Sequence, residues 1–447
     1  MVRFGTSGIR GAVQSALRPE TAVLVARAVA ADASSVVVGR DSRTTSEAIY
    51  DAVIGGVLSG GATVEAIGLV PTSALAYASR GRVGIMVTAS HNPPTDNGLK
   101  VFSDGRELDR ESERRVEADV ADGLSPVPWD QWGTRRDVSV IEAYRMDVLE
   151  YLAGAGPSLD GLRVAVDCGT GTAMQATPPV IRGIGGTVTT VNGTPDGHFP
   201  ARPSEPTPDS IAAFGRFVAA GETELGVAHD GDADRIVVVG PNGQVIHEDT
   251  VTAVLAACYV DRADVDDPVV IATSNASARI DALVEQAGGS VTRVPLGRLL
   301  DGIAEADGAA VFAAEPWKHV HPEFGPWIDG IASAGLFAGL VARAGGVEPL
   351  VSDVDEIPYL KTSLACPTPA KVAVMETMAK RIPEAFPDAS LETRDGIRAS
   401  LPDGSWLLVR PSGTEPKVRL YVESEDAERV LKEIETLVAT AIAAETD

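Results

Sequence analysis

The stretch that decides the fold is SVVVGRDSRTTSEAIYDAVIGGVLSGGATVEAI, residues 35–67. It opens with a β-branched run at 35–38, passes through a polar loop into a helix-like stretch, and reaches a second short strand after Gly60 and Gly61. The order strand, helix, strand is the signature of a βαβ unit, in which the two strands are parallel and the helix covers one face of the sheet. The stretch therefore predicts an α/β fold.

The same pattern occurs twice more along the chain. It begins again at Arg163–Val166, before Gly185-Gly186, and at Val269–Ala272, before Gly288-Gly289. The spacing of the three copies is too irregular, and the period too long, for a solenoid. We therefore predict three similar mixed-sheet α/β domains.

The part of the chain after about residue 351 is organised differently. A helix-like stretch at 370–385 is followed by short strands and by a last helix from Asp426 onward, which is the pattern of an α+β domain. A helix-like stretch at 141–152 joins the first two domains. The predicted domains are 1–152, 153–248, 249–350 and 351–447.

The composition is that of a folded protein. The chain has 447 residues, of which 44% are apolar and 23% charged, and this length suits three or four domains. No run reaches the roughly 18 apolar residues of a membrane span, and no basic and apolar leader opens the chain, so we expect a cytoplasmic protein. Cys168, Cys258 and Cys366 lie far apart without CxxC spacing, which predicts reduced core thiols.

The charge balance is strongly acidic. The chain has 63 Asp and Glu residues against 38 Lys and Arg residues, a formal net charge of −25. Such a surface repels nucleic acids and anionic membranes, so we predict neither as a partner. Lysines number only seven, and the acidic residues are dispersed. Because salt screens the self-repulsion of such a surface, we expect a halophilic archaeon as the source.

The first chemical motif is Thr88-Ala89-Ser90-His91-Asn92-Pro93, directly after a strand predicted at Val83–Val87. A hydroxyl at the carboxyl end of a parallel strand stands where α/β folds bind ligands, so Ser90 is a candidate nucleophile. Ser and Asn also form ordinary turns and helix caps, which is the alternative interpretation. A serine hydrolase is disfavoured, since Thr88 and Asn92 occupy the glycine positions of its G-x-S-x-G elbow.

The second motif is the loop His229-Asp230-Gly231-Asp232-Ala233-Asp234-Arg235 between two short apolar runs. Three carboxylates at alternate positions can converge on a hard cation when the backbone curves around it, and oxygen ligands suit Mg²⁺. An EF-hand calcium loop is excluded, because Arg235 replaces its glycine and Pro241 replaces its bidentate glutamate. A solvated acidic turn remains the alternative.

Two further segments suggest phosphate binding. Arg410-Pro411-Ser412-Gly413-Thr414-Glu415-Pro416-Lys417-Val418-Arg419 combines hydroxyls, a glycine and guanidinium groups, which can surround a phosphate, although a plain hairpin turn has similar residues. Phe4-Gly5-Thr6-Ser7-Gly8-Ile9-Arg10-Gly11 adds small residues and one arginine, and is compatible with docking into a cleft.

These four segments, in this order, resemble the α-D-phosphohexomutase family, and the resemblance covers essentially the whole chain. The family's active-site serine motif matches 88–93, its metal loop 230–235, its phosphate loop 410–414 and its N-terminal arginine motif 5–11. The resemblance implies four domains around a central cleft and a phosphorylated serine in the resting enzyme.

The resemblance also implies a role for each candidate residue. Ser90 would carry the phosphoryl group and would bind Mg²⁺ together with Asp230, Asp232 and Asp234. Lys100 resembles the family's general acid/base, Arg10 would neutralise charge at the transferring group, and His91 would orient the serine loop. A solvated side chain is the alternative for Lys100. The implied substrate-binding residues are Arg235, Glu315, Lys318, His319, Arg410, Ser412, Gly413, Thr414 and Arg419.

The sugar-reading loop departs from the family pattern. Most bacterial members have a loop resembling Gly-Glu-x-Ser-Gly-His, where this chain has Ala314-Glu315-Pro316-Trp317-Lys318-His319. Glu315 is retained and can accept hydrogen bonds from two sugar hydroxyls. The changed residues alter the reach and charge of the loop, so sugar specificity does not carry over. Core packing is an equal interpretation of Trp317, and the role of Arg298, where the family often has a substrate contact, stays open.

The expected reaction is the reversible interconversion of hexose 6-phosphate and hexose 1-phosphate through phospho-Ser90 and a bisphosphate. The opening GTSGIRG looks most like the phosphoglucosamine mutases, so glucosamine phosphate is the first expectation, before mannose or glucose phosphate. We expect Mg²⁺ as cofactor, glucose 1,6-bisphosphate or a similar activator that phosphorylates Ser90, and a monomer or homodimer. A Mg²⁺-dependent sugar phosphatase and a non-catalytic sugar-phosphate sensor are the alternatives.

Overall fold

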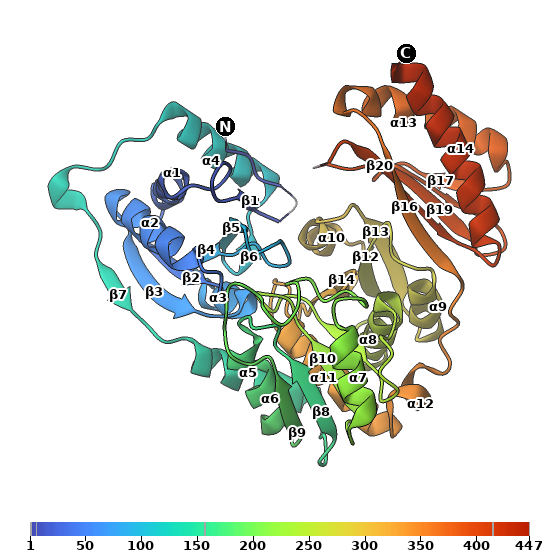
Figure 1. The fold of residues 1–447 in the computed structure, drawn as a ribbon, viewed down its shortest axis with the longest axis horizontal. Helices are drawn as coiled ribbons and strands as arrows, with labels where there is room; N and C mark the ends of the chain where they lie inside the picture. Colours follow the sequence, from blue (N-terminus) through green and yellow to red (C-terminus); the bar gives the residue numbers. More distant parts are fainter. Residues whose placement is uncertain (1, 6, 156–157, 414, 447) are drawn as a thin grey trace. The chain divides into compact units, whose positions relative to one another are not determined.

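The computed structural model describes residues 2–5, 7–155, 158–413 and 415–446 (Figure 1). These residues form two compact units, one made of 1–251 and 317–351 and the other of 252–316 and 352–447. The described residues form helices and four sheets that include both parallel and antiparallel strand pairs, so the predicted α/β class with mixed sheets is confirmed. The four predicted domain boundaries stay predictions.

The first unit begins with a seven-stranded sheet. Strands β2, β3, β4 and β7 are parallel, and β5 runs antiparallel to both β4 and β1. The strand order is β1 (Ile9–Ala12), β5 (Asp96–Ser103), β4 (Val83–Val87), β2 (Ser35–Arg40), β3 (Thr63–Leu69) and β7 (Arg135–Asp137), with β6 (Arg106–Glu107) paired to β5. The quoted stretch therefore forms a βαβ unit of β2, α2 (Ser46–Ser59) and β3.

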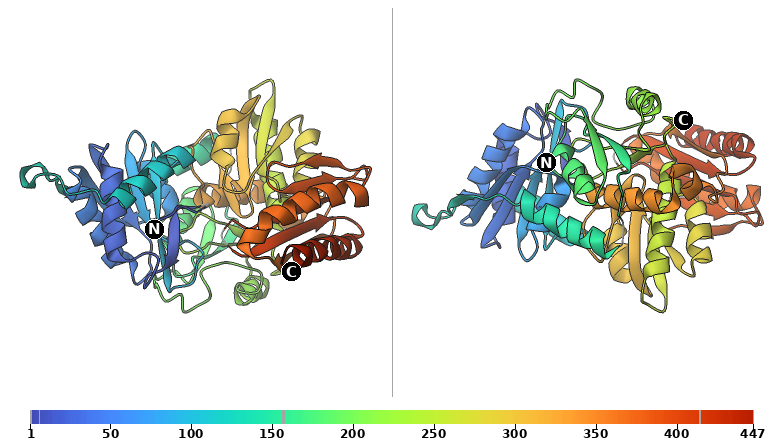
Figure 2. Two further views of the ribbon diagram at one scale, coloured as in Figure 1. Left: turned by 90° about the horizontal axis from the view of Figure 1, so that it is seen from above. Right: turned by 90° about the horizontal axis from the view of Figure 1, so that it is seen from below.

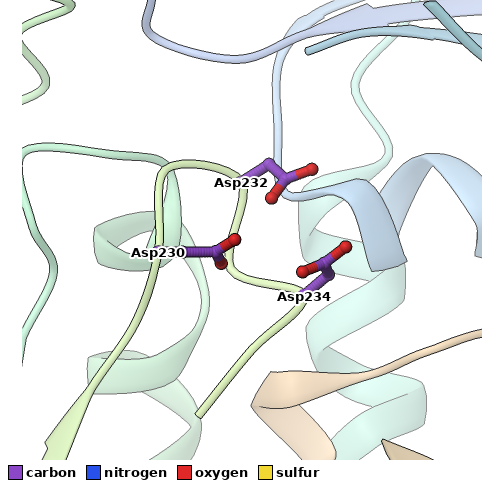
Figure 3. A group of neighbouring side chains, drawn as sticks. All are labelled: Asp230, Asp232 and Asp234. Atoms are coloured by element: carbon purple, nitrogen blue, oxygen red, sulfur yellow. The ribbon is translucent and has the colours of Figure 1, made fainter. Parts of the chain in front are cut away.

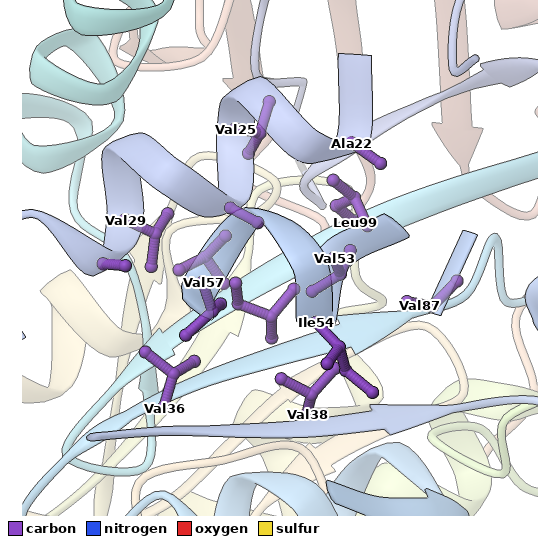
Figure 4. Packing of buried hydrophobic residues seen from close by; sticks show 14 of the residues in the cluster. Ala22, Val25, Val29, Val36, Val38, Val53, Ile54, Val57, Val87 and Leu99 are labelled. Atoms are coloured by element: carbon purple, nitrogen blue, oxygen red, sulfur yellow. The ribbon is translucent and has the colours of Figure 1, made fainter. Parts of the chain in front are cut away.

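Helices cover both faces of this sheet. Helix α1 (Pro19–Ala30) has proline at its start and Glu20 in its first turn, both of which favour a helix N-terminus. It packs with α2 over the side of the sheet that carries Val36 and Val38 (Figure 4). Gly39 faces the other side and approaches Leu75 of α3 (Thr72–Ala78). Helix α4 (Arg110–Asp122) packs against α1. Each fully buried valine of this core stabilises the fold by roughly 1.5–3 kcal/mol.

The second sheet of this unit has the order β11, β10, β8, β9. Its strands are β8 (Arg163–Asp167), β9 (Thr187–Val191), β10 (Leu225–Ala228) and β11 (Val237–Val239). Helix α11 packs against α5, α6 and β10, and it belongs to the segment 317–351, which returns to the first unit late in the sequence. The remaining elements here are α5 (Ile141–Gly154), α6 (Thr177–Gly183), α7 (Ala212–Ala220), β15 (Lys318–Val320), α11 (Gly330–Ala344) and α12 (Val347–Val351).

The second unit contains the third copy of the βαβ pattern and the α+β part. Strands β13 and β14 pair in parallel with β12 on either side of it. A five-stranded antiparallel sheet follows, with helices α13 and α14 packed together on one face (Figures 1 and 2). Helix α8 (Glu248–Arg262) begins in the first unit and ends in the second. The other elements of the second unit are β12 (Pro268–Thr273), α9 (Arg279–Gln286), β13 (Ser290–Val294), α10 (Leu299–Glu305), β14 (Ala309–Glu315), β16 (Tyr359–Ala365), α13 (Lys371–Ala385), β17 (Ser390–Glu392), β18 (Ile397–Ser400), β19 (Trp406–Pro411), β20 (Lys417–Glu423) and α14 (Ala427–Thr446).

Among the described residues, no helix is both long and apolar enough to cross a lipid bilayer. Cys168 and Cys366 are buried and Cys258 is partly buried, and none of the three forms a disulfide bond among the described residues.

Candidate active site and metal centre

The serine loop leaves the sheet at the carboxyl end of β4, as predicted. Ser90 is buried, and its backbone φ of 51° lies in the left-handed region that residues other than glycine rarely occupy. The hydroxyl of Thr88 accepts a hydrogen bond from Ser90 N at 2.9 Å and donates one to Asp41 at 2.8 Å. Such a conformation costs on the order of 1 kcal/mol or more, so the surrounding contacts must stabilise it.

Arg43 supplies most of those contacts. Its guanidinium donates to the carbonyl oxygens of Ser90 at 2.8 Å, Asn92 at 2.7 Å, Pro93 at 2.6 Å and Asp96 at 3.0 Å. Its Nε donates to Asp41 at 3.1 Å. Arg43 is 1% exposed, so these bonds are shielded from water. No sequence motif marks Arg43 and Asp41 as residues of the site, although both follow β2 at the sheet edge where the serine lies.

The three aspartates of the metal loop converge at the carboxyl end of β10 (Figure 3). All three are buried, and one oxygen from each lies within 4.8 Å of the others. The Ser90 hydroxyl donates a 2.6 Å hydrogen bond to Asp230 Oδ2. A side chain at Gly231 would meet the Ser90 carbonyl oxygen at 2.9 Å, so glycine is what allows the two loops to approach. The predicted nucleophile and the predicted metal ligands therefore share one site.

Protein donors hold both oxygens of Asp230 but only one oxygen each of Asp232 and Asp234. Thr72 Oγ1 donates to Asp232 Oδ2 at 2.6 Å, and Lys100 Nζ donates to Asp234 Oδ2 at 2.6 Å. The Oδ1 atoms of Asp232 and Asp234 are buried and have no hydrogen-bond partner within the described parts of the chain. Buried carboxylate oxygens are costly to leave unpaired, and oxygen is the ligand that Mg²⁺ prefers. The residues present therefore fit a magnesium ion.

Electrostatics favour the same interpretation. Burial, together with the charges of Asp234 and Asp232, raises the pKa of Asp230 to about 8. Burial also acts to raise the pKa of Asp234, but Lys100 and Lys318 lower it well below its usual value. Burial acts to lower the pKa of Lys100, yet Asp234 and Asp232 raise it above the ordinary value. A divalent cation would offset the repulsion among the carboxylates.

His91 contacts both the nucleophile and Arg235. Its Nδ1 is 3.4 Å from Ser90 Oγ, and its Nε2 is 3.4 Å from Arg235 Nη2. Burial, together with the charges of Arg235 and Arg10, lowers the pKa of His91 to about 2. A guanidinium only donates, so Nε2 accepts and the proton of the neutral ring lies on Nδ1. His91 can therefore orient Ser90 as a donor but cannot take its proton.

Arg10 reaches the site from the neighbouring strand. Gly98 pairs with it across β5 and β1, and a Cβ at Gly98 would lie 2.8 Å from Arg10 Cγ and 2.4 Å from Thr88 O. The Nε and Nη2 atoms of Arg10 are buried without a partner among the described residues. A guanidinium with unused donors can bind a phosphoryl oxygen.

The sugar loop is divided between the two units. Glu315 accepts a 3.3 Å hydrogen bond from Gly297 N in the second unit. Lys318 and His319, in the first unit, are 2% and 1% exposed. Lys318 Nζ lies 3.2 Å from Asp234, and His319 Nδ1 contacts Ser333 Oγ at 3.0 Å. The structure turns both side chains inward, so their contact with a sugar stays a prediction.

Trp317 is partly buried and packs against an apolar cluster of the second sheet. This contact confirms the packing interpretation of its ring. Arg298 forms an ion pair with Asp301, three residues further along the same helical turn.

The phosphate loop lies in the second unit, in a hairpin between β19 and β20 where Arg410 pairs with Arg419. Arg410 is buried and lies 3.5 Å from Asp395, and its Nε has no partner within the described residues. Arg419 donates to Glu415 at 2.8 Å. Ser412 is buried and Gly413 exposed, whereas Thr414 lies outside the described residues.

Lys371 supports this loop, although no sequence motif marks it as a residue of the site. Its Nζ donates to the carbonyl oxygens of Ser412 and Glu415, both at 2.6 Å.

Known proteins match this chain over nearly its whole length. Family models described as phosphoglucomutase/phosphomannomutase match domain I at residues 1–125, domain II at 147–243 and the C-terminal domain at 365–440. A phosphopentomutase of Thermococcus kodakarensis is 41% identical, with 95% of this chain and 94% of the relative covered. A probable phosphoglucosamine mutase of Methanopyrus kandleri is 38% identical over the same shares.

A solved structure has the same fold. It is a phosphoglucomutase/phosphomannomutase family protein from Burkholderia thailandensis, with a TM-score of 0.87 and 22% identity, and the match covers 98% of this chain and 97% of that one.

Proposed function

We propose, since this chain belongs to the α-D-phosphohexomutase family and is therefore an isomerase, that it moves a phosphoryl group between two hydroxyls of a sugar phosphate through Ser90. The observation that carries the proposal is the 2.6 Å contact of the Ser90 hydroxyl with Asp230, inside a buried group of three carboxylates. A nucleophile at a magnesium site is what phosphoryl transfer requires.

The transfer would proceed in two balanced halves. The free hydroxyl of the sugar phosphate gives its proton to neutral Lys100 and attacks the phosphorus of phospho-Ser90, the bond from phosphorus to Ser90 Oγ breaks, and a bisphosphate forms. The bisphosphate then turns and Ser90 Oγ takes the other phosphoryl group. The departing sugar oxygen takes the proton from Lys100, which leaves the isomeric monophosphate. Mg²⁺, when bound, supplies positive charge beside the phosphoryl oxygens.

The residues of the site suit these halves. Arg10 has free donors for the phosphoryl group. Lys100 is held protonated beside Asp234, so it is ready to donate a proton to the departing sugar oxygen. For the opposite half Lys100 must first lose its proton, and a cation on the aspartates favours that loss by weakening the ion pair. Arg410, Ser412 and Arg419 of the second unit remain the proposed ligands of the phosphate that does not react.

Glucosamine phosphate is the first proposed substrate, with mannose and glucose phosphates next. Support comes from the opening GTSGIRG motif and from the relatives that bear the name phosphoglucosamine mutase. A pentose phosphate is a further candidate, favoured by the 41% identical relative that bears the name phosphopentomutase.

The test is turnover of glucosamine, mannose, glucose and ribose 1-phosphates by the full chain, in high salt with Mg²⁺ and a trace of glucose 1,6-bisphosphate as activator. We expect conversion to the isomeric phosphate without release of inorganic phosphate. Ser90→Ala should lower turnover on the order of 10⁴-fold or more, whereas Ser103→Ala, at an exposed serine of β5, should not. Release of inorganic phosphate would indicate a phosphatase, and ligand binding without turnover would indicate a sensor.

A further inference from the structure

We propose that Lys318 is a charge-balancing residue of the metal centre. Its positive charge balances a phosphoryl group on Ser90 and weakens Mg²⁺ binding while Ser90 is unmodified. The inference rests on the proposed function, since it takes Asp230, Asp232 and Asp234 as the magnesium ligands. It gives a role to a residue of the sugar loop that departs from the family pattern.

Two buried lysines converge on one carboxylate oxygen. Lys100 Nζ lies 2.6 Å from Asp234 Oδ2, and Lys318 Nζ lies 3.2 Å from the same atom. The side chains of Lys100 and Lys318 are 1% and 3% exposed. Lysines are almost never buried to this degree unless they are paired, and two like charges beside one oxygen repel each other. The two lysines therefore place two positive charges directly beside the aspartates of the metal loop.

The backbone directs Lys318 to this place. The preceding residue, Trp317, has a φ of 66°. Its carbonyl oxygen accepts a 3.0 Å hydrogen bond from Ile236 N, at the end of the metal loop. This contact and the packing of the Trp317 ring fix the start of β15, so that Lys318 faces the aspartates.

Lys318 contributes charge more than orientation. Lys100 is closer to Asp234 Oδ2 and also lies 3.5 Å from Asp232, so it is sufficient to hold that oxygen and leave Oδ1 for a cation. What Lys318 alone adds is a further positive charge beside the site. A glycine, which the family pattern has here, would add none.

The charge suits a phosphorylated serine. Three aspartates, one Mg²⁺ and a phosphoserine of charge about −2 leave a net charge of about −3. Lys100, Lys318 and Arg10 supply three positive charges, while Arg235 pairs with Glu205 at 3.1 Å. Without the phosphoryl group, the three aspartates, Mg²⁺, Lys100, Lys318 and Arg10 together carry a net positive charge. The charge of Lys318 then opposes the binding of Mg²⁺.

The test titrates Mg²⁺ into the full chain by calorimetry, after phosphatase treatment and with intact mass showing unmodified Ser90. Lys318→Gln keeps a hydrogen-bond donor but removes the charge, and Lys318→Met removes both. We expect both variants to bind Mg²⁺ about tenfold more tightly than the natural chain. Lys380→Gln, at an exposed lysine of α13, is the matched control and should leave the Kd unchanged.

The phosphorylated fraction of Ser90 is a second readout, and it should fall in the variant whose Mg²⁺ affinity rises. After incubation with glucose 1,6-bisphosphate, the fraction of phosphorylated Ser90 should be lower in Lys318→Gln than in the natural chain. An unchanged or weaker Mg²⁺ affinity in Lys318→Gln would overturn the proposal, and tighter Mg²⁺ binding with an unchanged phosphorylated fraction would overturn its charge-balance part. The Mg²⁺ titration does not depend on turnover. The proposed function is tested separately, by the turnover and the Ser90 phosphorylation of the natural chain, so failure of one proposal can be told from failure of the other.

Discussion

The guanidinium of Arg43 donates a 2.8 Å hydrogen bond to the carbonyl oxygen of Ser90, although the two residues lie 47 positions apart in the sequence. The same group binds three further carbonyls of the loop that carries the nucleophile. A planar fork with five donors is suited to such a task, whereas an ammonium group is not. Arg43 therefore fixes the backbone on which the position of the Ser90 hydroxyl depends.

Replacement of Arg43 by lysine should lower kcat about 100-fold, because a nucleophile displaced by even 1 Å loses its alignment. Steady-state turnover and thermal unfolding of Arg43→Lys would be compared with those of Arg18→Lys, an exposed control. A variant with full kcat would show that other contacts are sufficient to hold the loop.

Replacement of Asp232 by asparagine should weaken Mg²⁺ binding about 10- to 100-fold, since one ligand oxygen loses its charge. Without metal, the same variant should be more stable than the natural chain, because the repulsion among the buried carboxylates falls. Calorimetry measures the first effect and thermal unfolding in EDTA the second. Asp209→Asn, at an exposed site, is the control. Unaltered Mg²⁺ affinity would argue against the aspartates as the metal site.

The stability of the first unit should depend on His229 in acid. Burial lowers the pKa of His229 to about 4, while its Nδ1 contacts Arg235 O at 2.8 Å and its Nε2 contacts Thr177 at 2.9 Å. Between pH 6.5 and pH 4 the unfolded chain binds a proton that the folded chain does not. The free energy of unfolding therefore falls as the pH falls, by on the order of 3 kcal/mol from this group.

Urea unfolding at a series of pH values measures this slope. His229→Gln should show a shallower decline, and His198→Gln, at a histidine whose side chain is 77% exposed, should keep the natural one. Equal slopes in all three proteins would mean that His229 is not the responsible group.

Low salt should destabilise the protein. A net charge of −25 repels itself more strongly as the Debye length grows from about 3 Å at 1 M salt to about 30 Å at 0.01 M. Circular dichroism during dialysis from molar KCl into dilute buffer should show loss of structure. Full retention of the folded signal would remove the support for a halophilic source.

Regular elements were predictable where residue type and period agree. The strand predicted at 83–87 is β4, and the apolar run before the metal loop is β10. The last helix, predicted from Asp426, begins at Ala427. Runs of β-branched residues closed by glycine pairs are local signals, so a single segment is enough to read them.

The residues that hold the active-site loops in place were not predictable in the same way. Arg43, Thr72 and Lys371 act on loops that lie tens to hundreds of residues away in the sequence. Which carbonyl or carboxylate they meet depends on the order of strands in a sheet, and no local pattern encodes that order. Lys318 illustrates the point, because its sequence neighbours suggest a sugar contact whereas the fold turns it toward Asp234.

The pairing of β5 with strands on both sides limits how this chain can change in length. Lys100 stands opposite Met86, and Gly98 stands opposite Arg10. Because successive side chains on a strand face opposite ways, one inserted residue between Gly98 and Lys100 would turn the lysine to the wrong face. Insertions and deletions in descendants of this sequence must therefore accumulate in the loops outside β5.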